Sequence, residues 1–273
     1  MGRSPIGVGV EVGRVTALWR YPVKSMAPET VPHTEVSWHG LAGDRRWAFA
    51  AERREQSGFP WLTIRDRPGM VRYRPRCADP EQPDLSPVVV TTPTGAELDV
   101  TDEALAAELG GGVRAVKLDR GTFDTLPLSL ITAGSVRALE VMAGRALDRR
   151  RFRPNLVIDA HGDQPFVEED WLGCTLGIGD ALVRIDARDR RCVVVNVDPA
   201  TGQRDPVVFR TIARHRDARL GVYAATVRPG HVAMGDPVTV VADPLDETAP
   251  ATPARPRPRP RSRSTGSSGT ATA

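Results

Sequence analysis

The sequence predicts a mainly β fold of the α+β class, built as a barrel or sandwich with a few helices. Most apolar segments are only as long as a single strand, and 25 glycines and 24 prolines interrupt them often. Apolar residues at helical spacing occur in only a few places. Short strands separated by frequent turn residues are typical of β-barrels and sandwiches.

The first half of the chain is expected to be mostly strands. Apolar residues alternate loosely in the first strand, which ends at the Tyr21-Pro22 turn, and a glycine-rich turn over residues 39–44 separates two later strands. The expected strands are Val10–Val23, Thr30–Trp38, Arg46–Ala51, Trp61–Ile64, Val71–Arg74, Val88–Thr92 and Ala96–Val100.

Three segments have a helical pattern. Thr101 or Asp102 can cap a short helix that reaches Leu109, where the glycines of residues 110–112 stop it. Longer helices are expected over Ala133–Leu147 and Val207–Arg216. The strands expected in this half are Arg153–Asp159, Thr175–Ile178, Ala181–Ala187, Cys192–Val197, Gly221–Arg228 and Pro237–Val241.

The end of the chain has a different composition. Residues 244–273 consist largely of Pro, Arg, Ser, Thr, Gly and Ala, so we expect a disordered tail. This tail holds five arginines and two acids, which accounts for the net charge of +3 and leaves the preceding part neutral. The net charge of the whole chain therefore gives no evidence for a large basic face on the folded part.

Several classes of protein and site are not expected. No apolar run is long enough to span a membrane, and the N-terminus lacks the pattern of a signal peptide, so we expect a cytoplasmic protein. The cysteines, Cys77, Cys174 and Cys192, have no CxxC spacing, which argues against a disulfide framework, a zinc site or an iron–sulfur cluster. The phosphate-binding loop, HExxH and GxSxG patterns are absent.

Cys192 is a candidate ligand for a soft metal. Two arginines precede it, and positive neighbours favour the thiolate, which binds soft metals or attacks electrophiles. The alternative is a buried, inert cysteine.

Three segments carry candidate site residues, and the first two of them are candidate phosphate sites. Lys24 and Ser25 lie where a strand runs into a turn, and Lys24 is one of only two lysines against 35 arginines. Arg45 follows a glycine turn, where it binds either a phosphate or the adjacent Asp44. Arg153 and Asn155 flank a proline that fixes the backbone, so both are presented rigidly.

Taken together and in this order, eight motifs resemble the MOSC proteins that carry an N-terminal MOSC β-barrel, a family that includes the amidoxime-reducing components. The resemblance covers roughly residues 10–241. The motifs are Tyr21–Ser25, Gly43–Trp47, Arg151–Asn155, Glu169–Trp171, Gly177–Gly179, Arg191-Cys192, Val197–Gly202 and Gly230–Asp236.

The resemblance implies two β-barrel-like parts with a molybdenum cofactor, Mo-molybdopterin, between them. The domains would be a MOSC N-terminal β-barrel over residues 10–125 and a MOSC domain over residues 126–243, followed by the tail. Cys192 would be the metal ligand and catalytic residue. The residues implied to hold the cofactor are Lys24, Ser25, Arg45, Thr125, Arg153 and Asn155.

The resemblance also implies an oxidoreductase that reduces N-hydroxylated small molecules and, as a property of the family as a whole, pyridoxal phosphate binding. The chain lacks the ferredoxin-type domain of some relatives, so we expect electrons from a separate ferredoxin- or cytochrome-like protein. Neither a membrane nor nucleic acid is expected as a partner.

Two alternatives stay open. In the first, Cys192 carries cofactor or persulfide sulfur to another protein without turnover. In the second, the chain is a binding module whose arginine-rich tail attaches to nucleic acid or an acidic partner.

Overall fold

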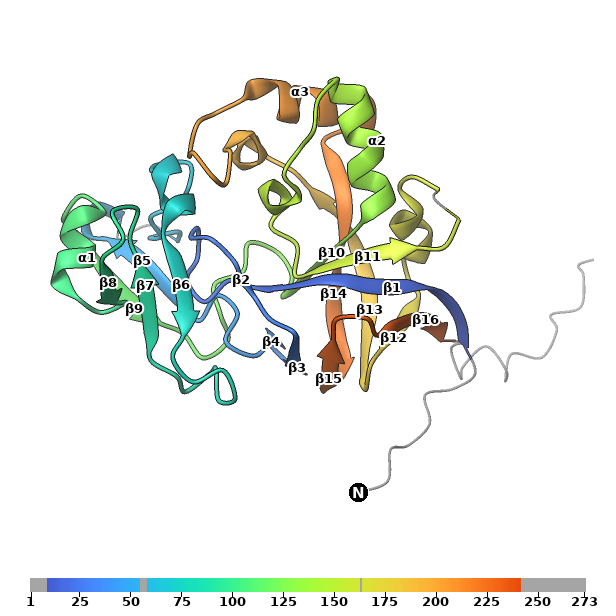
Figure 1. Cartoon of the computed structure of the whole chain (residues 1–273), viewed down its shortest axis with the longest axis horizontal. Helices are drawn as coiled ribbons and strands as arrows, with labels where there is room; N and C mark the ends of the chain where they lie inside the picture. The colour runs from blue at the N-terminus through green and yellow to red at the C-terminus, as the bar shows by residue number, and fades with distance from the viewer. Residues whose placement is uncertain (1–8, 55–57, 163, 242–273) are drawn as a thin grey trace, which may run out of the picture. The chain divides into compact units, whose positions relative to one another are not determined.

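The computed structural model describes residues 9–54, 58–162 and 164–241. Three α-helices, five short 3-10 helices and sixteen strands lie within them, so the predicted mainly β fold with a few helices is confirmed (Figure 1). No helix in these ranges is long and apolar enough to cross a membrane. The expected tail, residues 244–273, lies outside the described residues.

Seven strands close into a barrel, because the first strand of the chain pairs with strands on both of its sides. Leu18, Leu130, Leu176, Ile185 and Val222 are fully or almost fully buried within the barrel's apolar core. In spatial order the strands are β11 (Leu156–Ala160), β10 (Leu128–Thr132), β14 (Arg219–Arg228), β13 (Ala181–Arg190), β12 (Thr175–Ile178), β16 (Pro237–Val241) and β1 (Gly9–Arg20).

The strand that closes the barrel comes from the opposite end of the chain. β1 pairs with β16 from Gly9 opposite Val241 onward, and with β11 as far as Leu18 opposite Leu156. Figure 1 shows β1 lying beside both of these late strands. The barrel therefore contains residues from both ends of the described chain, while the predicted division at residue 125 stays a prediction.

The region between β1 and β10 folds into smaller sheets around an apolar core of its own. Phe49, Met70, Val90, Leu105 and Leu109 are buried in it. β2 (Glu29–Thr30) extends the barrel sheet beyond β1. The remaining strands are β3 (His33–Ser37), β4 (Gly40–Leu41), β5 (Trp47–Ala51), β6 (Arg74–Cys77), β7 (Val88–Thr91), β8 (Glu97–Asp99), β9 (Val113–Lys117) and β15 (Gly230–Ala233).

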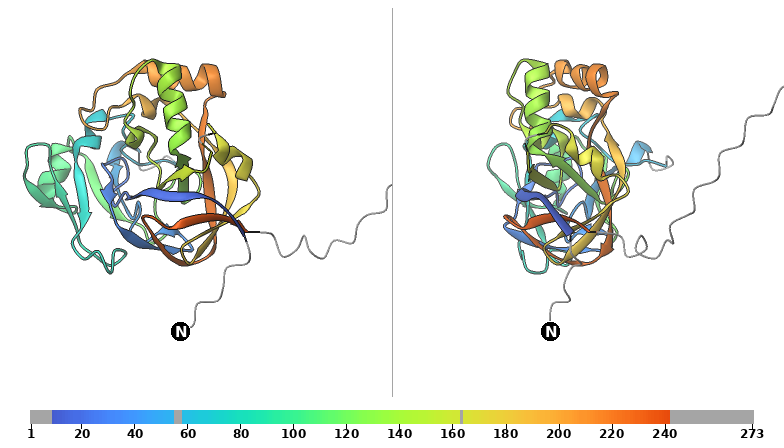
Figure 2. Two further views of the ribbon diagram at one scale, coloured as in Figure 1. Left: turned by 45° about the vertical axis from the view of Figure 1, so that its right-hand side comes forward. Right: turned by 90° about the vertical axis from the view of Figure 1, so that its right-hand side faces the viewer.

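The helices begin at side-chain caps, of which the one at Asp102 was predicted from the sequence. The Asp102 carboxylate accepts a hydrogen bond from the Ala104 amide at the start of α1 (Glu103–Glu108). α2 (Ala133–Ala143) starts at Thr132, and α3 (Pro206–Arg216) starts at Asp205. Figure 2 shows α2 and α3 side by side against the barrel. Their buried apolar residues pack with Ile131 of β10 into a second core.

Several expected elements are wrong or misplaced. Trp61–Ile64 is not a strand, because the Asp66 carboxylate accepts hydrogen bonds from the Thr63 amide and hydroxyl and curls the chain into a turn. The first half of the expected strand Val71–Arg74 belongs to the 3-10 helix η2 (Pro68–Arg72), and the strand β6 begins only at Arg74.

Other boundaries differ by a few residues. The helix expected to reach Leu147 ends at Ala143, where Gly144 adopts a left-handed conformation. The strand expected from Arg153 begins at Leu156, because Arg153 is itself left-handed and precedes a proline. The sequence reading missed β9, β10 and β15.

Candidate functional site

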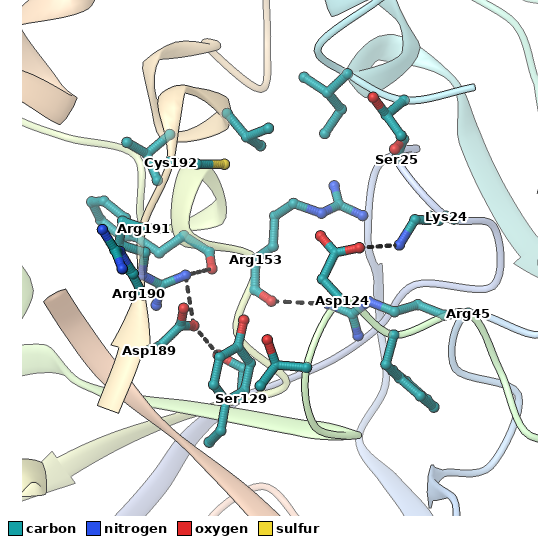
Figure 3. Close-up of a pocket in the computed structure, with 18 of the residues that line it drawn as sticks. Lys24, Ser25, Arg45, Asp124, Ser129, Arg153, Asp189, Arg190, Arg191 and Cys192 are labelled. Atoms are coloured by element: carbon teal, nitrogen blue, oxygen red, sulfur yellow. Dashed lines mark hydrogen bonds and ion pairs between the residues drawn. The ribbon is translucent and has the colours of Figure 1, made fainter. Parts of the chain in front are cut away.

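All seven residues proposed from the sequence line one cavity of about 400 Å³. One side of it is formed by the smaller sheets and the loop before β10, and the other side by the barrel strands and their connections (Figure 3). The seven are Lys24, Ser25, Arg45, Thr125, Arg153, Asn155 and Cys192. Segments far apart in sequence therefore meet here, while the chemical role of each residue stays a prediction.

Lys24 is a buried cation rather than a solvated surface lysine. Its backbone amide donates to the Trp47 carbonyl, which fixes the turn after β1, and Ser25 next to it is left-handed. The residue Lys24 is only 7% exposed, and its ammonium donates to the Thr122 carbonyl at 2.8 Å and to the Asp124 carboxylate at 2.6 Å. Burial lowers the pKa of Lys24, and the charge of Asp124 opposes this effect.

Arg45 pairs with Asp44, which is one of the two arrangements that the sequence left open, while its binding to a phosphate stays a prediction. Its guanidinium pairs with the fully buried Asp44 and also lines the cavity. It further donates to the Arg153 carbonyl at 3.2 Å and packs over the Tyr21 ring at 4.6 Å. These contacts hold Arg45 rigidly beside the next cation, Arg153.

Arg153 lines the cavity and carries a buried hydrogen-bond donor that has no partner among the described residues. Its Nη1 donates to the Met26 carbonyl at 2.8 Å, but its buried Nη2 has no hydrogen-bond partner among the described residues. Figure 3 shows the side chain extending between the wall that carries Cys192 and the wall that carries Lys24. Burial lowers the pKa of Arg153 to about 10, so the group remains a cation at neutral pH. A buried donor without a partner is costly, and an anion in the cavity would satisfy it.

Asn155 lines the cavity, but its amide mainly holds the barrel together. Its Oδ1 accepts a hydrogen bond from the Ser129 amide at 3.1 Å, and its Nδ2 donates to the Trp19 carbonyl at 3.2 Å. A longer contact of 3.5 Å joins Oδ1 to Arg45. Asn155 therefore positions β1 and β10 around the site.

Cys192 directly precedes a short helix and does not open a strand. The expected strand Cys192–Val197 is wrong, because residues Val193–Asn196 form the 3-10 helix η5. Arg151 donates to the Asn196 carbonyl at 3.1 Å, while Val195 packs into the core beneath α2 and α3. These tertiary contacts override the β preference of the valines. Cys192 is partly exposed and faces the cavity, so it is not an inert core cysteine.

The guanidinium that touches the cysteine sulfur belongs to Arg65. Its Nη2 lies 3.2 Å from the Cys192 Sγ, although the two residues are far apart in sequence. The neighbouring Arg191 points elsewhere and donates to the Leu220 and Phe152 carbonyls. The sequence reading missed Arg65, because nothing distinguishes it there from the other arginines.

A buried polar cluster on the cavity floor was also missed. Asp189 accepts hydrogen bonds from the Ser129 hydroxyl at 3.1 Å and from Tyr223, and it lies 2.8 Å from the Arg191 guanidinium. Burial raises the pKa of Asp189, which Arg191 opposes, and burial raises the pKa of Tyr223 to about 12. The cluster fixes Arg191 and thereby the backbone that carries Cys192.

Two known protein families match adjacent parts of the chain and together cover nearly all of the described residues. Residues 12–120 match the MOSC N-terminal beta barrel domain, and residues 119–239 match the MOSC domain. Within the described residues, no group of three or more His, Cys, Asp or Glu side chains is placed to hold a metal ion.

Individual relatives are distant. The chain is 28% identical to the molybdenum cofactor sulfurase of Drosophila grimshawi, over 81% of this chain but only 34% of the length of that relative. It is 25% identical to the human mitochondrial amidoxime-reducing component 1, over 84% of this chain and 83% of that protein. Among solved structures, the YuaD protein from Bacillus subtilis has a TM-score of 0.45 at 12% identity, over 84% of this chain and 95% of that one.

Proposed function

The chain belongs to the MOSC proteins that carry an N-terminal MOSC β-barrel domain, and on that premise we propose that it binds a molybdenum–pterin cofactor and reduces N-hydroxylated small molecules. One observation carries the proposal: a cysteine sulfur, a buried ammonium and an unsatisfied guanidinium line the same cavity. The name of the amidoxime-reducing relatives supports the reaction class.

The residues present fit such a cofactor. The cavity of about 400 Å³ lies within the usual range for small-molecule sites. A cysteine sulfur is a suitable ligand for a soft metal, and the opposite wall offers cations and a hydroxyl to a phosphate. The Arg153 Nη2, buried without a partner among the described residues, is the donor that a bound anion would satisfy.

The proposed contacts divide between the metal and the phosphate. Cys192 would ligate the metal, while Lys24, Ser25 and Arg153 would bind the pterin phosphate. Arg45 and Thr125 line the same side, and Asn155 holds the strands behind it. Because Asp124 is the present partner of Lys24, a phosphate would compete with this carboxylate for the ammonium.

The proposed reaction breaks the N–O bond of the substrate. It consumes two electrons and two protons and releases the hydroxyl oxygen as water. The molybdenum centre, when bound, supplies the two-electron change, and a separate donor protein of the ferredoxin or cytochrome class would return the electrons. The chain's own residues bind the cofactor and position the substrate beside Cys192.

Metal analysis tests this proposal. Protein produced with molybdate is compared with Cys192→Ser and with Cys174→Ser, which changes a partly buried cysteine outside the cavity. We expect wild type and Cys174→Ser to contain molybdenum and to reduce benzamidoxime with a chemical electron donor. Cys192→Ser should lose both properties, and full retention of molybdenum in this variant would refute the assignment.

A sulfur carrier is the second candidate, favoured by the match to molybdenum cofactor sulfurases and by the partly exposed Cys192 sulfur. In this case mass spectrometry should find a persulfide on Cys192. The protein should then show no reductase activity with any donor, even when it contains molybdenum.

A further inference from the structure

The cavity carries more positive charge than a cofactor phosphate requires. Seven of its lining side chains are cationic and two are carboxylates. Most of these cations already have partners. Lys24 pairs with Asp124, Arg45 with Asp44, Arg151 with Asp198, and Arg191 with Asp189.

Two guanidiniums on the Cys192 side remain available after Arg153 is assigned to the phosphate. Among the described residues, the Arg65 side chain makes one hydrogen bond, to the Cys192 Sγ. Arg190 lines the same cavity two positions before Cys192 and is exposed. A guanidinium has several N–H donors, so Arg65 can hold an additional group while it contacts the sulfur.

The backbone of Arg65 is fixed although its side chain is exposed. The Arg204 guanidinium donates to the Arg65 carbonyl at 2.8 Å, and the Arg65 amide donates to the Thr63 hydroxyl at 3.3 Å. These bonds fix the backbone from which the Arg65 side chain reaches the Cys192 sulfur. A fixed guanidinium beside the reacting atom is suited to orienting a substrate.

We propose that Arg65, assisted by Arg190, binds a carboxylate of the substrate, so that the preferred substrates are N-hydroxylated molecules with an acidic group. This inference rests on the proposed function. The planar guanidinium matches a carboxylate in a bidentate pair, and the uncompensated positive charge disfavours cationic substrates. Because the Arg65 Nη2 is 3.2 Å from the cysteine sulfur, a carboxylate held there places the rest of the molecule next to the metal ligand.

A purely structural role for Arg65, in which it only supports the sulfur, makes a different prediction. Loss of that support would impair acidic and neutral substrates to the same degree. If Arg65 binds a carboxylate, its loss would lower kcat/KM more for the acidic substrate than for the neutral one. The comparison between matched substrates therefore separates the two roles.

The first experiment needs neither metal nor turnover. The full chain, produced without molybdate, reacts with iodoacetate and with the neutral iodoacetamide, and mass spectrometry gives the rate ratio of the two reagents at Cys192. Both reagents react with the same sulfur, so a change in its nucleophilicity alters both rates alike and leaves their ratio unchanged. We expect Arg65→Gln to lower the ratio roughly tenfold, because the anionic reagent loses its local attraction.

Arg67→Gln is the matched control. Arg67 is exposed on the same loop, carries the same charge and does not line this cavity. The ratio should stay within about twofold of wild type in this variant. An unchanged ratio in Arg65→Gln, or an equal fall in both variants, would overturn the proposal.

The second experiment uses the molybdenum-loaded protein. Values of kcat/KM are compared for benzamidoxime and its 4-carboxylate derivative. Wild type should prefer the carboxylate, and Arg65→Gln should lower kcat/KM for the acidic substrate roughly tenfold more than for the neutral one. Arg65→Lys, which keeps the positive charge but loses the planar guanidinium, should retain part of the preference for the acidic substrate.

The two experiments separate failure of the inference from failure of the proposed function. If neither substrate is reduced, the proposed reaction fails and the alkylation ratio alone decides whether Arg65 attracts a carboxylate to Cys192. If both are reduced without preference in wild type, or if Arg65→Gln lowers both equally, the reductase assignment survives and the role of Arg65 is wrong.

Discussion

Lys24 shows how a single residue can be identified before the fold is known. The chain uses arginine almost everywhere, so a lysine at a strand-to-turn junction stands out. The structure places this lysine inside the cavity, with its ammonium beside Asp124. The other lysine, Lys117, lies on the exposed edge of β9 and serves as a natural control.

Replacing Lys24 tests the phosphate side of the site. Lys24→Gln should weaken cofactor retention roughly tenfold, because a charge-assisted hydrogen bond to phosphate is lost. Lys117→Gln should leave retention unchanged. Molybdenum per chain after extended dialysis measures the effect, and equal metal content in the two variants would exclude Lys24 from phosphate binding.

The residues that the sequence reading missed differ from those it found in a physical way. Lys24, Arg153 and Cys192 stand out through their composition or through their neighbours in the chain. Arg65, Asp189 and Tyr223 gain their importance only from partners that folding brings to them. Such residues could not be recognised without the pairing of the strands.

At the scale of elements, the turn that carries Arg65 depends on Asp66. Its carboxylate pairs with Arg54 and accepts hydrogen bonds from Thr63, and these interactions hold the pKa of Asp66 at about 2, below its usual 3.8. Because this pKa is lower in the folded state, the stabilisation is complete above about pH 4. It is lost as the pH falls through about 2.

Asp66→Asn should therefore destabilise the protein by about 1 kcal/mol at pH 7, a figure reduced for the partial exposure of the pair. Chemical denaturation at pH 7 and at successively lower pH measures the difference between the variant and wild type. The difference should shrink between about pH 4 and pH 2. A difference that stays constant over this range would show that the carboxylate charge is not responsible.

Gly144 and Gly221 both have a left-handed backbone, but only Gly221 lacks space for a side chain. Comparing their alanine variants therefore distinguishes the cost of backbone strain from the cost of a steric clash. Gly144 ends α2, and a Cβ there would meet nothing within 4 Å. Gly221 lies in β14, where a Cβ would lie 2.7 Å from the Leu130 carbonyl oxygen. Alanine should cost about 1 kcal/mol at Gly144 and about 3 kcal/mol at Gly221. Denaturant unfolding of both variants checks this order, and equal losses would contradict it.

Residues 192–197 and β10 were predicted poorly because their structure depends on contacts with residues distant in the sequence. Residues 192–197 have a strong β preference, yet they turn into η5 because Val195 is buried beneath the helices and Arg151 holds the Asn196 carbonyl. β10 was missed although it lies buried between two barrel strands. All five of its residues are buried, so the segment lacks the regular alternation of a half-buried strand by which the other strands were predicted.

At the scale of the whole molecule, β1 links the two ends of the described chain. Residues 119–239 match a single family, yet the barrel that they form is open without β1. A fragment of residues 119–241 should therefore lack a cooperative unfolding transition, because β11 and β16 would each keep an unpaired edge.

A circular permutant tests this dependence directly. Gly9 lies opposite Val241 in the barrel, so a short loop can join residue 241 to residue 9 as a hairpin. The fragment 119–241 extended in this way by residues 9–30 should regain a cooperative transition in thermal unfolding. If the unextended fragment already unfolds cooperatively, β1 is not required for the barrel.

The position of β1 also determines when the barrel can form during translation. Among the described elements this strand is made first, and its partner β16 is made last. At synthesis rates of roughly 5–20 residues per second, the wait is on the order of ten seconds or more. Throughout that interval the nascent chain exposes the edge of β1 that later pairs with β16, and unpaired strand edges of this kind are segments that holding chaperones bind.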